Sequence, residues 1–295
     1  RFPLPSSVLM TAVTARAAGV REVVVASPRP APVTIAAAHV AEADMLLCVG
    51  GAQAIGAMAY GVTVPRCDVI VGPGNRWVTA AKKLVAGEVG IDSLAGPSEL
   101  VVLADGSAAR EARLIAADLL AQAEHDTDAS ATLVTTSASL ADAVDRELAR
   151  QIEVLPTRET AAAALANGMC VVAADLDEAI GVVGDLAPEH LELFVEDARG
   201  VARRITHFGA VFLGSGSAEV FGDYGVGPNH VLPTGGAARH AAGLSVMHFL
   251  RVRTWLEMTH GEVDAGVISD TARLARLEGL EAHARAAEAR GHRPR

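Results

Sequence analysis

Short apolar runs rich in β-branched residues alternate with longer alanine-rich stretches along most of this 295-residue chain. In the first third, the apolar runs fall at residues 22–26, 45–49 and 68–71, and each is followed by a stretch of helical composition. Buried strands separated by helices are typical of a parallel sheet with helices on both faces. The sequence therefore predicts an α/β fold for this part of the chain.

A second series of the same kind begins near Ser98 and continues to about residue 213. After it, the stretch 214–243 is rich in Gly, Pro, Asn and His and has no regular period, and helical composition returns from Leu244 onward. We expect two Rossmann-like α/β domains, at 1–97 and 98–243, and a helical extension at 244–295. The second series predicts strands at 99–104, 131–136, 170–173, 190–195 and 210–213, and helices at 109–125, 140–155, 177–183 and 198–207.

The charge balance excludes several classes of partner. The chain has 25 Lys and Arg against 35 Asp and Glu, a formal net charge of −10, so the basic surface that nucleic acids and anionic membranes require is not expected. Aromatic residues make up only 3% of the chain, too few for a base-stacking platform. The apolar segment 45–62 approaches the length of a membrane span, but glycines and a strand-to-helix change interrupt it, so no span is expected.

Three cysteines, Cys48, Cys67 and Cys170, lie far apart in the sequence and form no CxxC pair. We expect buried, reduced thiols in a cytoplasmic protein, and no zinc site built from thiolates.

Two glycine-rich loops follow predicted strands and precede predicted helices. They are Gly50-Gly-Ala-Gln53 and Gly72-Pro-Gly-Asn75. Exposed N–H groups at a helix start suit a phosphate, and loops at the carboxyl edge of an open sheet are the usual ligand site. Neither loop is a GxGxxG or P-loop motif, so a plain tight turn remains the alternative.

Several polar groups could perform chemistry, although each also has a structural explanation. Gln122 and His125 share one face at the end of a predicted helix, and they are either two metal ligands or solvated residues of a helix end. Glu189 and His190 follow Pro188 where a loop meets a strand, as an acid–base pair or as ordinary surface residues. Asp223, Asn229 and His230 lie among glycines in the irregular stretch, which favours a binding role, whereas Glu278 and His283 suggest only a solvated helical face.

Taken together, these strings resemble the histidinol dehydrogenase family, the zinc- and NAD-dependent enzymes of the last steps of histidine biosynthesis. The order of the strings matches that of the family along nearly the whole chain. The matching strings begin at Pro3 (PLPSSVLM), Gly50 (GGAQAI), Val71 (VGPGN), Ala95 (AGPSE), Gln122 (QAEHD), Ala187 (APEHLEL), Gly222 (GDY), Gly227 (GPNHVLPT) and Glu278 (EGLEAH).

The resemblance implies a role for each of these sites. It implies zinc ligands at Gln122, His125, Asp223 and His283, which also contact the substrate. It implies an acid–base pair at Glu189 and His190. Further substrate contacts are implied at Ser98, His190, His230 and Glu278. NAD contacts are implied at Gln53 and Asn75. It also implies a homodimer in which the C-terminal helices bring Glu278 and His283 to the partner's site.

The implied reaction is a four-electron oxidation of L-histidinol through histidinal to L-histidine, with two NAD used in sequence. His190 would take the hydroxyl proton, and Glu189 would activate water for the second step. Family members carry a further N-terminal segment that packs into the second α/β unit, so we expect that this chain lacks it and leaves a sheet edge unpaired. Two alternatives stay open: a related zinc and NAD dehydrogenase of another small polar alcohol, and a non-catalytic assembly module.

Overall fold

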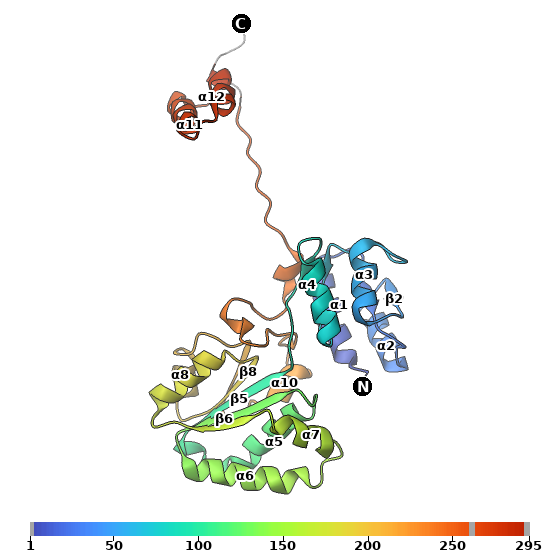
Figure 1. Cartoon of the computed structure of the whole chain (residues 1–295), viewed down its shortest axis with the longest axis vertical. Coiled ribbons are helices and arrows are strands. Elements are labelled where there is room, and N and C mark those ends of the chain that lie inside the picture. Colours follow the sequence, from blue (N-terminus) through green and yellow to red (C-terminus); the bar gives the residue numbers. More distant parts are fainter. Residues whose placement is uncertain (1–2, 260–262, 292–295) are drawn as a thin grey trace. The chain divides into compact units, whose positions relative to one another are not determined.

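The computed structural model describes residues 3–259 and 263–291, and the chain divides into two units, Arg1–Leu250 and Arg251–Arg295. The first half of the larger unit contains two pairs of short parallel strands, β1 with β2 and β3 with β4 (Figure 1). Its elements are α1 Pro5–Ala17, β1 Val24–Ala26, α2 Pro32–Val40, β2 Met45–Leu47, α3 Gly51–Tyr60, β3 Val69–Ile70, α4 Arg76–Val85 and β4 Gly90–Ile91.

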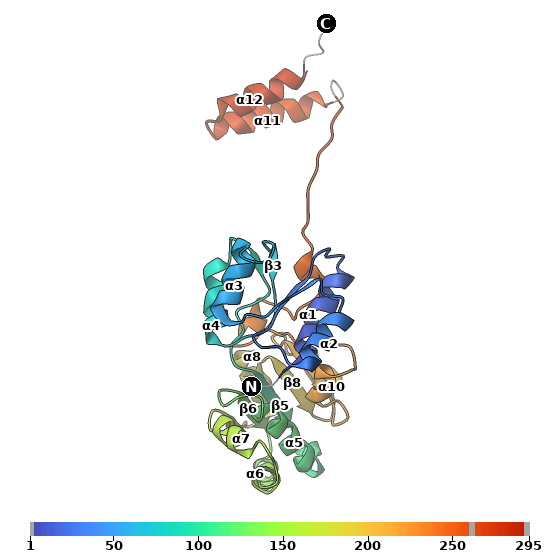
Figure 2. The same ribbon diagram turned by 90° about the vertical axis from the view of Figure 1, so that its right-hand side faces the viewer.

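Alternating side chains of β1 explain why helices cover both faces of this half. Val25 packs into a core with α1 and α2, whereas Val24 and Ala26 pack against the core formed by α3 and α4. Figure 2 shows these two helix pairs on opposite sides of the strands. The predicted α/β class, with helices on both faces of parallel strands, is confirmed for this half.

The second half of the larger unit is built on a five-stranded sheet of order β7-β6-β5-β8-β9, in which all neighbours are parallel. Residues Leu100, Val102 and Ala104 of the central strand pack against α5 and α6, and Val101 and Leu103 pack against α8. The elements are β5 Glu99–Ala104, η1 Gly106–Arg110, α5 Ala112–Ala123, β6 Ser130–Thr135, α6 Ala138–Ile152, α7 Arg158–Leu165, β7 Met169–Val172, α8 Leu176–Leu186, β8 His190–Phe194, α9 Ala198–Ala202 and β9 Ala210–Leu213.

Two helices differ from the prediction. The helix predicted over 140–155 ends at Ile152, and a separate helix, α7, follows Pro156, because proline cannot continue the preceding helix. The helix predicted over 198–207 ends at Ala202, and Ile205 beyond it is buried in the core next to the sheet.

The prediction that the cysteines are buried is wrong for two of the three. Cys170 is exposed on β7, an outer strand, and Cys48 is exposed directly after β2. Cys67 is half-buried, and burial raises the pKa of its thiol. Apolar runs in outer strands keep one side open to solvent, which explains the error.

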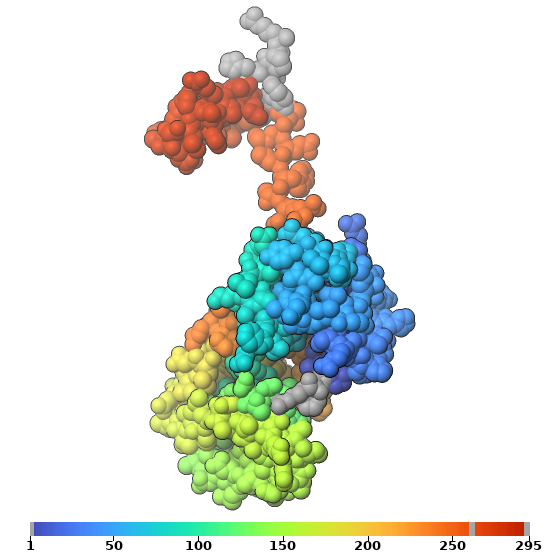
Figure 3. All heavy atoms as spheres, turned by 45° about the vertical axis from the view of Figure 1, so that its right-hand side comes forward, coloured from blue at the N-terminus to red at the C-terminus, as the bar shows by residue number. Residues whose placement is uncertain are grey.

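The irregular stretch after β9 connects the two halves of the larger unit. It contains α10 Glu219–Asp223, η2 Ala237–Arg239 and, further on, η3 Val246–Phe249. Asn229 Nδ2 donates to the carbonyl of Met10 at 2.9 Å and to Thr14 Oγ1 at 3.1 Å, both on α1. Figure 3 shows the blue-to-cyan first half adjoining the green-to-yellow second half.

The smaller unit is a helical hairpin of α11 Ala265–Leu277 and α12 Glu281–Glu288, followed by η4 Ala289–Gly291. Its core is small and consists of Ala272, Ala275 and Ala284. Residues 251–259 form neither helix nor strand, so the prediction of helix from Leu244 onward is wrong for this segment. Good helix formers such as Leu256 and Glu257 occur in it, so helix propensity alone does not decide its conformation. Among the described residues, no helix combines the length and the hydropathy that crossing a bilayer requires.

Candidate active site

Glu189 and His190 lie buried at the amino end of β8, next to the start of β5. The Glu189 carboxylate is 6% exposed and accepts hydrogen bonds from Ser98 Oγ at 2.7 Å and from the Glu99 backbone N–H at 2.9 Å. Burial raises the pKa of Glu189 to about 8, and these two bonds offset that effect only in part. Ser98 therefore contacts the Glu189 carboxyl directly, a contact that the spacing of the two residues did not reveal.

The His190 imidazole is oriented by a backbone carbonyl. Its Nδ1 lies 3.1 Å from the carbonyl oxygen of Glu99, and because that oxygen can only accept, Nδ1 carries the proton. Nε2 then keeps its lone pair. Burial lowers the pKa of His190 to about 4, so the ring is neutral near pH 7 and Nε2 can act as a base.

The imidazole and the two nearest carboxyls lie close together without a direct hydrogen bond between them. His190 Nδ1 is 3.6 Å from Glu189 Oε2 and 3.6 Å from Glu219 Oε1. Glu219 is 3% exposed, and its carboxyl reaches the site from α10.

A second group gathers around Asp223, the last residue of α10. His125 Nε2 lies 3.8 Å from Asp223 Oδ2, and His230 Nδ1 lies 3.7 Å from Asp223 Oδ1. His125 Nδ1 is 3.0 Å from the carbonyl of Ala121, so Nδ1 donates to that oxygen and Nε2 is the ring nitrogen that faces the carboxylate. The Asp223 carboxylate raises the pKa of His125.

Gln122 is the least satisfied side chain of the site. It is fully buried in α5, and neither atom of its amide has a hydrogen-bond partner in the described part of the chain. Leaving a buried amide unpaired costs free energy, so such a group calls for a partner such as a bound ion, a ligand or a water. With His125 and Asp223 it offers one nitrogen and two oxygen donors, a set that suits zinc.

The described residues do not form a complete metal site on their own. No group of three or more His, Cys, Asp and Glu side chains among residues 3–259 and 263–291 is arranged to hold a metal. A zinc ion would need the Gln122 amide oxygen and a further ligand in addition to His125 and Asp223.

The two groups belong to one site. Asp223, His125 and His230 all act electrostatically on the pKa of His190, and His125 acts on that of Glu189. The site lies where the carboxyl end of α5 meets the amino ends of β5 and β8.

The two glycine-rich loops line one cavity of about 850 Å³ in the first half of the larger unit. Gly50, Gly51, Gly72, Gly74 and Asn75 all contribute to its wall. The Asn75 side chain also caps α4, because its Oδ1 accepts from the backbone of the first turn at 3.0 and 3.2 Å.

Gln53 is exposed in the first turn of α3 and is not among the residues that line this cavity.

A buried ion pair holds the second glycine-rich loop, Gly72–Asn75. Lys82 Nζ contacts Asp92 Oδ1 and donates to the carbonyl of Gly72 at 3.1 Å, and Asp92 Oδ2 accepts from Gly72 N–H at 2.7 Å.

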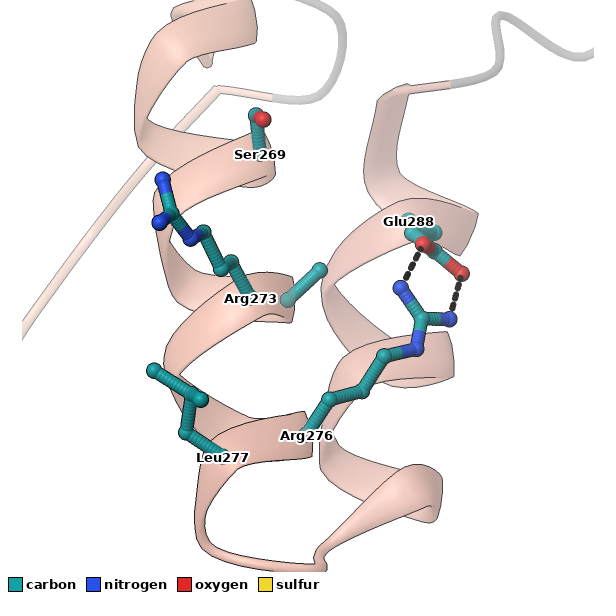
Figure 4. A pocket seen from close by; sticks show the side chains of 6 residues that line it. Ser269, Arg273, Arg276, Leu277 and Glu288 are labelled. Carbon is teal, nitrogen blue, oxygen red and sulfur yellow. Dashed lines mark hydrogen bonds and ion pairs between the residues drawn. The ribbon is translucent and has the colours of Figure 1, made fainter.

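Glu278 and His283 both lie in the smaller unit and are exposed. Glu278 directly follows α11, and His283 lies in the first turn of α12. A hollow of about 390 Å³ in the smaller unit is lined by residues that include Arg273, Arg276 and Glu288. Figure 4 shows these three side chains on α11 and α12. The Arg276 guanidinium is bonded to the Glu288 carboxylate at 2.7 and 3.1 Å.

Sequence reasoning missed three carboxyls near the site, the buried ones of Glu192 and Glu219 and the half-buried one of Asp118. Glu192 follows His190 by two residues, so its side chain lies on the same face of β8, and this spacing was a usable signal. Asp118 and Glu219 reach the site only through the fold.

Comparison with known proteins identifies the relatives of this chain. A family model described as histidinol dehydrogenase matches residues 1–291. Histidinol dehydrogenase of Thermus thermophilus is 51% identical over 290 residues, covering 98% of this chain and 70% of the relative. That of Parasynechococcus marenigrum is 50% identical over 291 residues, covering 96% of this chain and 66% of the relative.

A solved structure gives the same result. The crystal structure of histidinol dehydrogenase from Elizabethkingia anophelis superposes with a TM-score of 0.91 at 36% identity, over 97% of this chain and 67% of that one. The chain thus spans about two thirds of the length of the relatives that it matches.

Proposed function

The chain belongs to the histidinol dehydrogenase family, a family of NAD-dependent oxidoreductases of histidine biosynthesis, and we propose that it oxidises L-histidinol through histidinal to L-histidine. The observation that carries the proposal is the pairing of a buried, neutral His190 with a buried Glu189, beside a fully buried Gln122 amide that has no partner among the described residues. We further propose a cytoplasmic location, where the three free thiols stay reduced.

Zinc would be held by Gln122, His125 and Asp223, with His283 of the partner subunit as the fourth ligand. The unpaired Gln122 amide and the position of His125 Nε2, which faces Asp223, support this set. Bound zinc supplies a positive charge that orients the amine and imidazole of the amino alcohol and stabilises negative charge on its oxygen.

NAD would occupy the cavity lined by the two glycine-rich loops, with Asn75 in its wall as one contact and Gln53, which lies outside that wall, as a second. The start of α3 has no side-chain cap, so its backbone N–H groups suit a phosphate, whereas the Asn75 side chain already caps α4. The shared cavity supports a single nucleotide site. Bound NAD supplies the hydride acceptor, and two NAD are used in sequence.

In the first half-reaction, His190 takes the hydroxyl proton on Nε2 while hydride leaves the substrate carbon. The Glu99 carbonyl bound to Nδ1 keeps the ring in the correct tautomer and stabilises the imidazolium that forms. Ser98 and His230 would bind the substrate from the same chain, and Glu278 from the partner.

In the second half-reaction, Glu189 removes a proton from water as the water attacks the aldehyde carbon, and a second hydride leaves. A carboxylate whose pKa is raised to about 8 is a stronger base than an ordinary glutamate, once it is ionised. Keeping both steps at one buried pair prevents loss of the reactive aldehyde.

Formation of NADH from L-histidinol and NAD, with and without zinc, tests the proposal. We expect two NADH per histidinol, loss of activity on chelation and recovery with zinc. Turnover of other small polar alcohols, with none of histidinol, would favour a related dehydrogenase instead. Zinc binding without any turnover, in this chain and in one extended to the length of its relatives, would favour an assembly module.

A further inference from the structure

Glu192 is a fully buried carboxyl to which the proposed reaction gives no role. It is 1% exposed on β8, two residues after His190 and therefore on the same face of the strand. An uncharged apolar side chain of similar volume would fill this place without the desolvation that a carboxyl requires. Packing alone does not explain a carboxyl at this position.

One oxygen of Glu192 is bonded to the helix that carries Asp223. Glu192 Oε1 accepts a hydrogen bond from the backbone N–H of Glu219 at 2.7 Å. Glu219 is the first residue of α10, and N–H groups at a helix start have no partner within the helix. The bond therefore fixes the beginning of a five-residue helix whose last residue is Asp223.

The same carboxyl contacts the helix that carries Gln122. The Asp118 carboxyl of α5 is close enough to Glu192 for each group to shift the pKa of the other, and Glu192 Oε2 is buried with no hydrogen-bond partner in the described part of the chain. Two carboxyls at such a place can share a hydrogen bond only if one of them holds a proton. Burial, together with the charge of Asp118, raises the pKa of Glu192 to about 8, so Glu192 is the group that can donate near neutral pH. Asp118 precedes Gln122 by four residues and lies on the same face of α5.

We propose that Glu192 is a positioning residue that ties α5 to α10 across β8, and thereby sets the placement of Gln122, His125 and Asp223 for zinc. This inference rests on the zinc set proposed above. In this proposal Glu192 itself contacts neither the substrate nor the metal. Supporting bonds of this kind commonly affect metal affinity by roughly 10- to 100-fold.

Two substitutions at Glu192 separate this hydrogen-bonded connection from simple burial. Glu192→Gln keeps an oxygen that accepts from Glu219 N–H and supplies an amide N–H to the Asp118 carboxylate. Glu192→Leu keeps the bulk, loses the bond from Glu219 N–H and removes the polar group that faces Asp118. Leu140→Ala is the matched control, because Leu140 is 2% exposed and packs in α6, an element that carries none of the proposed site residues.

Zinc affinity, measured in the full chain by competition with a chromophoric chelator, is the main measurement. Thermal unfolding without zinc and the separate kcat and KM values accompany it. We expect Glu192→Leu to bind zinc roughly 10- to 100-fold more weakly and Glu192→Gln to stay within about threefold of the unchanged chain. Leu140→Ala should lose thermal stability and keep its zinc affinity.

Unchanged zinc affinity in Glu192→Leu would overturn the inference, and so would a loss in Glu192→Gln as large as that in Glu192→Leu. An equal loss in Leu140→Ala would also overturn it, because general destabilisation would then account for the effect. Failure of the proposed function has a different signature: the unchanged chain itself would bind zinc no better than Asp223→Ala.

Discussion

Glu189 should govern the pH dependence of the second half-reaction. Its pKa is raised to about 8 by burial, so the carboxyl is mostly protonated at neutral pH and becomes a base as the pH rises. With histidinal as substrate, kcat/KM should rise with pH and level off above about pH 8. His190, whose pKa is lowered to about 4, is already neutral throughout this range and adds no second rise.

Glu189→Gln is the matched variant for this profile. It should remove the rise and lower aldehyde oxidation by roughly 10²- to 10⁴-fold, the usual contribution of a general base. A rise of the same size and midpoint in Glu189→Gln would assign the titration to another group.

The sequence predicted individual site residues unevenly. Two adjacent residues, Glu189 and His190, were recognisable as a candidate pair from their position at a strand start. Asp118 and Glu219 were not recognisable, because each lies far in the sequence from the residues that it contacts, and a local sequence pattern does not reveal such contacts. The hydrogen bond between Glu192 and Glu219, for example, joins residues 27 positions apart. Tautomers and shifted pKa values follow from burial and hydrogen bonds, which only the folded chain defines.

At the scale of elements, Asn75 at the start of α4 has a capping role and a proposed NAD-binding role, which can be tested separately. Its Oδ1 caps the helix, so Asn75→Ala should cost about 0.5–2 kcal/mol of unfolding free energy, whereas Asn75→Asp keeps the capping oxygen and most of that stability. If Asn75 also contacts NAD, Asn75→Asp should still raise KM for NAD, because its charge repels phosphate. Urea unfolding and NAD titration measure the two effects. An unchanged KM in both variants would restrict Asn75 to capping.

The ion pair behind the second glycine-rich loop should be important for stability. Both side chains of the Lys82–Asp92 pair are 3% exposed. Asp92→Asn leaves a buried lysine without its counter-charge and should cost about 3–5 kcal/mol. The double variant Lys82→Met, Asp92→Asn removes the unpaired charge and should recover part of this loss in urea unfolding. A cost below 1 kcal/mol for Asp92→Asn would show that the charge is relieved by solvent.

The element order was largely predictable because apolar periodicity follows burial. The core strands β5, β6 and β8 were predicted to within about two residues, since β5 and β6 are mainly apolar runs and β8 alternates polar and apolar residues. Boundaries were missed where tertiary packing decides them, as where Ile205 enters the core in place of a longer helix. Edge exposure was also missed, because an outer strand such as β7 has the same composition as a central one.

At the scale of the whole molecule, the proposed exchange of C-terminal helices can be tested by complementation. His283→Ala and Glu189→Gln should each be inactive alone. If His283 serves the partner's site, each mixed dimer has one intact site, and random exchange of equal amounts should restore about a quarter of the unchanged activity. Activity that stays at the level of the separate variants after subunit exchange would place His283 in the site of its own chain.

The side chains that follow the strands of the large sheet have a different consequence. Within three residues after the ends of β5, β6, β7 and β8 stand Asp105, Ser137, Asp175 and Asp197, and each side chain accepts a backbone N–H of the next helix. The edge at which open α/β proteins usually bind ligands is thus occupied by caps, and the chemistry lies at the opposite edge. The two edges of the sheet can therefore vary independently. Loops at the capped edge can be lengthened, tagged or attached to a surface without moving the reacting groups at the opposite edge.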